Sequence, residues 1–128
     1  MNETLRLKYL QIALVAIGIT FIVGIYLLGM VWPSGWTWHS SGHSNYLDMI
    51  IGVYATLGVF LILAARKPLA HLSLIWFTVW SSVVHGVIMM VQSFASPMDH
   101  GHLIGDVPAL FIVAAVLAAL TPRGGKAL

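Results

Sequence analysis

Four apolar stretches separated by short polar segments organise the chain. They run approximately over residues 9–30, 46–65, 69–94 and 103–120. Each is close to the ~20 residues that a helix needs to cross the hydrocarbon core of a bilayer. Lipid offers backbone N–H and C=O groups no partner, and the alternating pattern of a β-barrel is absent, so the spans are expected to be helical. The pattern predicts an all-α, four-transmembrane-helix bundle, with residues 1–128 forming a single integral membrane domain.

The composition agrees with a membrane location. Of the 128 residues, 59% are hydrophobic and only 8% are charged, and the mean hydropathy is +0.93. These values are typical of membrane proteins and not of soluble domains. Cysteine is absent from the sequence, which excludes a disulfide framework, a thiolate metal site and a cysteine nucleophile.

The basic residues predict the orientation of the bundle. They precede the first span, separate the second from the third, and follow the fourth: Arg6, Lys8, Arg66, Lys67, Arg123 and Lys126. Segments 31–45 and 95–102 contain none. By the positive-inside rule, both termini and the central loop are expected in the cytoplasm and the other two loops outside. Because the basic residues form no single patch, we expect the lipid bilayer and no nucleic acid as a partner.

Short connections and helix-start residues predict how the spans begin and pack. The loop around Arg66 is so short that the second and third spans are expected to form a tight antiparallel hairpin of neighbouring helices. Asn45 is a candidate N-cap for the second span, with Asp48 in its first turn. Asp106 is a candidate N-cap for the fourth span, with Pro108 in its first turn.

Small residues four positions apart predict close helix contacts, because they let two backbones approach each other. The candidate pairs are Ala114 with Ala118, Ala115 with Ala119, and Gly52 with Thr56.

A polar stripe marks one face of the third span. His71, Thr78, His85 and Gln92 follow one another at intervals of seven residues. Two turns of an α-helix take about 7.2 residues, so these side chains share one face. Lipid would leave imidazole and amide groups unpaired, so we expect this face to point into the bundle or toward a partner subunit. His85 is expected a few turns below the outer surface.

Histidines and carboxylates are expected to converge at the outer end of the bundle. The group comprises Asp48, Asp106, His85, His39, His43, Asp99, His100 and His102. Imidazole and carboxylate are ligands that suit divalent transition metals such as zinc or copper. One hypothesis is therefore an outward-facing metal site with His85, His100 and His102 as first-choice ligands, and Asp48 and Asp106 completing or orienting the set.

Other interpretations of the same residues stay open. The aspartates could serve only as helix caps, with the loop histidines solvated. Haem is less favoured than a bare metal ion, because His85 has no second histidine at its depth on another helix. Ser81 and Ser82 lie one turn from His85, but no nucleophile elbow accompanies them, so an enzyme is not expected. The alternative function is an accessory subunit of a larger membrane complex, or a homo-oligomer, that binds no ligand.

Four stretches of the sequence carry a resemblance to a known family. They are WPSGWTW, GHSNYLDMIIGVYATLGVFL, RKPLAHLSLIWFTVWSSVVH and PMDHGHLIGDVPAL. Together they resemble a bacterial family of small four-helix integral membrane proteins of unknown function, over nearly the whole chain from about Leu7 to Arg123. The resemblance implies a multi-pass protein of the bacterial inner (cytoplasmic) membrane. It implies no activity and no site residues.

Overall fold

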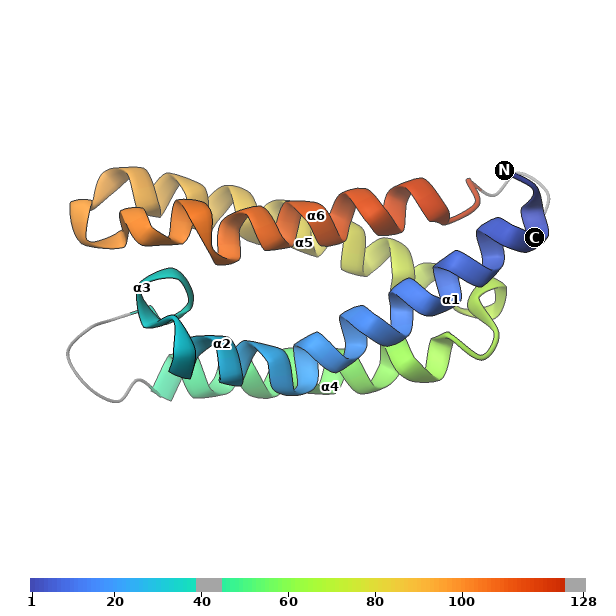
Figure 1. Ribbon diagram of the computed structural model, residues 1–128, viewed down its shortest axis with the longest axis horizontal. Coiled ribbons are helices and arrows are strands. Elements are labelled where there is room, and N and C mark those ends of the chain that lie inside the picture. The colour runs from blue at the N-terminus through green and yellow to red at the C-terminus, as the bar shows by residue number, and fades with distance from the viewer. Residues whose placement is uncertain (39–44, 124–128) are drawn as a thin grey trace.

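Helices make up all the regular structure in the part of the chain that this computed structural model describes, residues 1–38 and 45–123. In chain order the elements are α1 (Glu3–Ile19), the π-helical turn η1 (Thr20–Gly24), α2 (Ile25–Val31), α3 (Pro33–Trp36), α4 (Asn45–Ala64), the 3-10 turn η2 (Pro68–His71), α5 (Leu72–Ala95), the 3-10 helix η3 (Pro97–Ile104) and α6 (Asp106–Leu120) (Figure 1). The predicted all-α fold is confirmed.

Within the described residues, four continuous helical runs are long and apolar enough to cross a membrane: Glu3–Val31, Asn45–Ala64, Pro68–Ala95 and Pro97–Leu120. The second and third runs begin and end within one residue of the predicted spans. The first begins six residues earlier than expected, because the Asn2 side chain accepts a hydrogen bond from the Leu5 N–H at 2.7 Å and caps α1.

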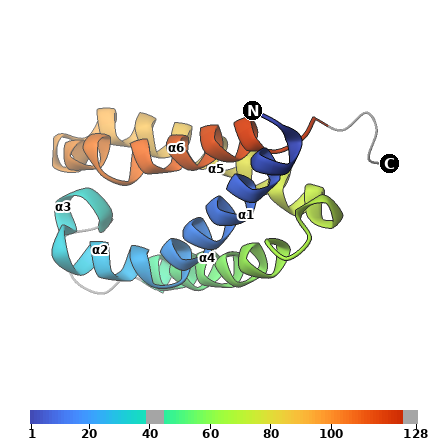
Figure 2. The same cartoon turned by 45° about the vertical axis from the view of Figure 1, so that its right-hand side comes forward.

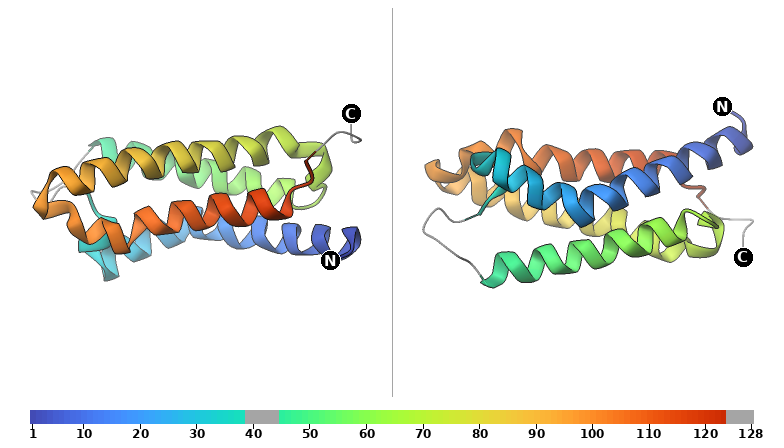
Figure 3. Two further views of the ribbon diagram at one scale, coloured as in Figure 1. Left: turned by 90° about the horizontal axis from the view of Figure 1, so that it is seen from above. Right: turned by 60° about the horizontal axis from the view of Figure 1, so that its bottom comes forward.

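The helices pack as two pairs. α1 and η1 lie along α4, whereas α5 lies along α6 (Figures 1 and 3). α1 runs obliquely and also touches α6 near its own N-terminus, which joins the two pairs at that end (Figure 2). The predicted tight hairpin of the second and third spans is therefore wrong beyond its turn. α4 and α5 are consecutive and antiparallel, but each packs mainly against another helix.

Glycines explain why α4 prefers α1 as its partner. A Cβ atom on Gly18 would lie 2.7 Å from the Gly58 carbonyl oxygen, and one on Gly58 would meet the Gly18 oxygen at 2.5 Å. Only two facing glycines permit this backbone approach. The predicted contact at Gly52 and Thr56 is wrong, because a Cβ on Gly52 meets no described atom within 4 Å, and Thr56 donates to the Gly52 carbonyl of its own helix at 2.9 Å.

The predicted small residues on the last helix divide between two faces. Ala114 belongs to the apolar core and Ala118 packs against it. Ala115 and Ala119 are exposed on the other face of α6. The first pair thus faces inward, as its contact role requires.

The start of α1 and the end of α6 meet at one end of the molecule (Figure 1). There the Arg6 guanidinium donates hydrogen bonds to the carbonyl oxygens of Ala119, Leu120 and Thr121 at 3.0 to 3.1 Å. These carbonyls belong to the last turn of α6 or follow it directly, so the arginine acts as a C-terminal cap. We call this end of the molecule the basic end.

The core extends from the basic end toward the middle of the bundle. Its fully buried members come from all four long helical runs: Leu10, Leu14, Leu61, Ile75 and Leu117. On the predicted polar face of the third span, Thr78 is buried and His85 is partly buried, so the prediction that this face points inward is confirmed in the middle of the span. His71 and Gln92, at the two ends of the stripe, are exposed. Beyond this core, toward the opposite end, the two helix pairs enclose a cavity.

Candidate functional site

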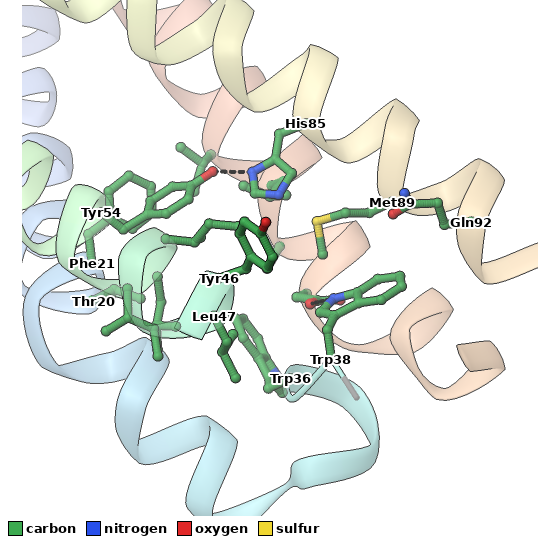
Figure 4. Close-up of a pocket in the computed structure, with 17 residues that line it drawn as sticks. Thr20, Phe21, Trp36, Trp38, Tyr46, Leu47, Tyr54, His85, Met89 and Gln92 are labelled. Carbon is green, nitrogen blue, oxygen red and sulfur yellow. Dashed lines mark hydrogen bonds between the residues drawn. The ribbon is translucent and has the colours of Figure 1, made fainter. Parts of the chain in front are cut away.

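A cavity of about 260 Å³ lies between the two helix pairs, away from the basic end. One wall comes from η1, from the first residue of α2 and from α4, and the other wall comes from α5 and α6 (Figure 4). Trp36 and Trp38 close it from the side of α3. Most of the lining side chains are aliphatic or aromatic, and we therefore call it the aromatic cavity.

A hydrogen bond between α4 and α5 forms one boundary of the aromatic cavity. The Tyr54 hydroxyl is bonded to Nδ1 of His85, and the second ring nitrogen of His85 faces the cavity (Figure 4). Phe21 holds the Tyr54 ring edge-on, with the ring centroids 4.9 Å apart and the planes at 83°. Edge-to-face packing is a favoured aromatic geometry, so the tyrosine is fixed on both its apolar and its polar side.

The π-helical turn η1 shapes the wall that faces His85. Thr20 and Phe21 from this turn, and Ile25 just beyond it, all line the cavity. A π-helical turn holds an additional residue, so the side chains after it point in a different direction than they would on a regular α-helix. Such turns are frequent at functional sites. The apolar sequence of this span gives no sign of the π-helical turn.

Asp106 holds the loop after α3 in place. Its two carboxylate oxygens accept hydrogen bonds from the indole N–H of Trp38 at 2.9 Å and from Nδ1 of His102 at 3.0 Å. The Trp38 and His102 rings also stack, 4.0 Å apart and inclined by 21°. The predicted N-cap role of Asp106 is wrong: Asp106 is the first residue of α6, and Gly105 precedes it without a side-chain cap. Its carboxylate instead joins two segments distant in sequence.

Glycines also bring α3 close to η3. A Cβ on Gly101 would collide with the Ser34 backbone, and one on Gly105 would collide with the backbone of Gly35. Residues 97–104 form a 3-10 helix packed on α3 where a loop was expected over residues 95–102. This close contact, together with the Asp106 bonds, sets Trp38 against the aromatic cavity.

The predicted ligand residues do not gather at one point. His85 and Asp106 both line the aromatic cavity, whereas His102 does not line it. His102 is hydrogen-bonded to Asp106. His100 and Asp48 are exposed and are not among the lining residues. The other two candidate histidines, at positions 39 and 43, lie outside the described residues.

The helical form of η3 explains why its two histidines separate. His102 is 2% exposed, whereas His100 is on the surface. Residues two apart on a 3-10 helix point in different directions, since three residues complete a turn. In residues 1–38 and 45–123, no three His, Cys, Asp or Glu side chains lie where they could hold one metal ion. The metal site stays a prediction.

Several residues of the aromatic cavity were not predicted from the sequence. Tyr46, Ile50 and Tyr54 lie along one face of α4 and all line the cavity. Their spacing of four residues was a usable signal, because residues four apart share a helix face. Trp36 also lines the cavity. Its indole N–H is buried and meets no acceptor within the described part of the chain.

Fold and site together define a class: a small helical bundle with membrane-length helices arranged as two pairs around a ligand-sized cavity. Residues 4–127 match a family of unknown function, DUF6632, and the chain belongs to this family. The comparisons with curated proteins and with solved structures gave no match. The expected membership of a family of unknown function is thereby confirmed over nearly the whole chain.

Proposed function

We propose that this protein is a multi-pass membrane protein that binds a small, largely apolar ligand in the aromatic cavity. The observation that carries the proposal is the cavity itself, about 260 Å³ in volume and walled by aromatic and aliphatic side chains around His85 and Asp106. Small-molecule sites combine apolar walls with a few convergent polar groups. The volume suits a ligand of about one or two rings and is small for a macrocycle such as haem.

Unused hydrogen-bonding capacity supports a bound ligand. The buried Trp36 N–H lacks an acceptor among the described residues. His85 uses one ring nitrogen for Tyr54 and turns the other toward the cavity. A buried donor without a partner, such as the Trp36 N–H, costs about 1–3 kcal/mol, so a polar group on a bound ligand would relieve this cost.

The distribution of charge supports a position on the non-cytoplasmic side. Arg6 and Thr121 meet at the basic end, and the turn containing Arg66 and Lys67 lies at that same end (Figure 1). The positive-inside rule then favours a cytoplasmic basic end with both termini inside. On this orientation the aromatic cavity opens in the outer half of the membrane, which in a bacterium would be the inner membrane.

The test is an NMR titration of the protein in lipid nanodiscs with 2-methylnaphthalene as the probe. The Met89 side chain points into the cavity (Figure 4), so its 13C-labelled methyl signal is expected to shift saturably. The signal of Met98, which is 78% exposed, serves as the internal control. Ala109→Phe fills the cavity and should abolish the shift, whereas Ala119→Phe on the exposed face of α6 should preserve it. A Met89 signal that never moves would reject the proposal.

The metal hypothesis concerns the same end of the molecule. Its support is the pair of His102 and Asp106, whose Nδ1 and Oδ1 atoms lie 3.0 Å apart. Elemental analysis of protein purified without a histidine tag tests it. One equivalent of zinc or copper per protein, lost in His102→Ala, supports the metal site. Clearly less than one equivalent, unchanged by this substitution, rejects the metal site.

The accessory-subunit alternative rests on a second apolar surface. A groove on the α5–α6 pair is lined by Trp76, Trp80, Phe111 and Ala115, with Arg123 at one end. Native mass spectrometry from a mild detergent tests whether this surface binds a second subunit. A ligand-loaded monomer supports the aromatic cavity as the functional site, and a stable empty oligomer supports the alternative.

A further inference from the structure

We infer that the ligand of the aromatic cavity is a membrane-soluble quinone, held through one carbonyl oxygen by Nε2–H of His85. The inference rests on the proposed function and specifies its ligand class. It follows from the proton on His85, from the shape of the walls and from the side on which the cavity reaches the surface.

The bond to Tyr54 determines what His85 offers to a ligand. A phenol hydroxyl is a good donor, so when it donates to Nδ1 the single proton of a neutral imidazole resides on Nε2. Nε2 is the nitrogen that faces the cavity (Figure 4). The histidine therefore presents an N–H donor, which requires an acceptor on the ligand. A carbonyl oxygen meets this requirement and an alkyl chain does not.

The walls suit a flat ring. Tyr46, Trp36 and Trp38 surround the cavity together with Met89 (Figure 4). Aromatic rings and a thioether bind a planar ring through stacked, edge and sulfur contacts. Trp36, whose buried indole N–H has no acceptor within the described ranges, also belongs to this wall. A quinone is planar and largely apolar and carries acceptor oxygens, so it matches walls that supply aromatic rings and the His85 donor.

The cavity reaches the surface between α4 and α5. Its lining includes Tyr46 and Ile50 on α4, which are 79% and 45% exposed, and Gln92 on α5, which is also exposed. Both helices are long and apolar enough to span the membrane, so this side is expected to face lipid. A ligand dissolved in the bilayer can then enter sideways, as the hydrocarbon tail of a quinone requires.

The test compares 2-methyl-1,4-naphthoquinone with 2-methylnaphthalene, which share one planar carbon skeleton but of which only the quinone carries carbonyl oxygens. Each is titrated into nanodisc-embedded protein while the Met89 methyl signal is followed, and empty nanodiscs correct for partition into lipid. One additional hydrogen bond should make the quinone bind roughly 3- to 10-fold more tightly. His85→Phe should remove this preference, and His71→Phe, an exposed position in the turn preceding α5, should retain it.

The outcomes separate this inference from the proposed function. Equal affinity for both probes overturns the quinone and leaves the cavity as an apolar site. A preference that survives in His85→Phe overturns the assigned role of His85, and no shift with either probe overturns both proposals. Should His85→Phe fail to fold, the role of His85 is tested in the wild-type protein through its own NMR signal. The His85 Nε2–H signal must shift with the quinone and stay in place with the hydrocarbon.

Discussion

Tyr54 on α4 is hydrogen-bonded through its hydroxyl to Nδ1 of His85 on α5, and the bond joins two helices whose main packing partners lie elsewhere. Tyr54→Phe removes the bond and keeps the ring that packs on Phe21. We expect a loss of about 1 kcal/mol in the free energy of unfolding, measured in mixed micelles.

The same substitution has a spectroscopic consequence. Without the phenol donor, the 15N signals of His85 are expected to report a mixture of the two neutral tautomers in place of one. Tyr26→Phe is the control, since Tyr26 on α2 is 58% exposed. Unchanged stability together with unchanged nitrogen shifts at His85 would show that the bond does not form in the membrane.

Gly58→Ala should strongly destabilise the α1–α4 pair. The new Cβ would lie 2.5 Å from the Gly18 carbonyl oxygen and 2.9 Å from the Ile22 side chain. Overpacking of this kind costs about 1–3 kcal/mol or more, because backbone must move. Gly52→Ala on the same helix is the matched control and should be neutral or stabilising by up to about 1 kcal/mol, since its Cβ meets open space. Equal changes in the free energy of unfolding for the two substitutions would contradict the close contact of α1 and α4 at Gly58.

Arg6→Met should loosen the end of α6. The guanidinium donates three hydrogen bonds to carbonyl oxygens there, and bonds from a charged donor contribute about 1.5–3 kcal/mol in partly buried positions. Lys8→Met removes the same charge from an exposed neighbour and should change stability by less than about 0.5 kcal/mol. Hydrogen exchange of the Thr121 amide, which donates to Leu117, measures the difference. Equal exchange in both variants would refute the capping role.

Asp106→Asn should release the segment that carries Trp38. Trp38 and His102 donate to different carboxylate oxygens, and an asparagine replaces one of these oxygens by an NH2 group, so one of the two donors then faces another donor. The amide of Thr37, bonded to the Pro33 carbonyl at 2.8 Å, is expected to exchange on the order of 10-fold faster. Asp99→Asn on η3 is the control. Protection of Thr37 that is the same in both variants would show that another contact holds α3.

The sequence by itself determined how many long helices the described part of the chain has, and that they are apolar enough to cross a membrane. Lipid leaves backbone groups no partner except one another, so length and hydropathy suffice to predict four membrane-length helices. Residues 45–64 were located within one residue because polar or basic residues flank the apolar run. Polar periodicity likewise predicted that Thr78 faces inward, since lipid offers its hydroxyl no hydrogen-bond partner.

Tertiary structure alone decided which helices pair and what the histidines contact. The first, second and fourth spans are apolar on all faces, so hydropathy does not show which face of each helix meets a neighbour. The α1–α4 pairing depends on where Gly18 meets Gly58. His85, His102 and Asp106 lie at one end, as the topology predicted, yet their partners Tyr54 and Trp38 could not be read from spacing. Such contacts join residues 31 and 68 positions apart, and only the packed arrangement of the helices fixes which side chains meet.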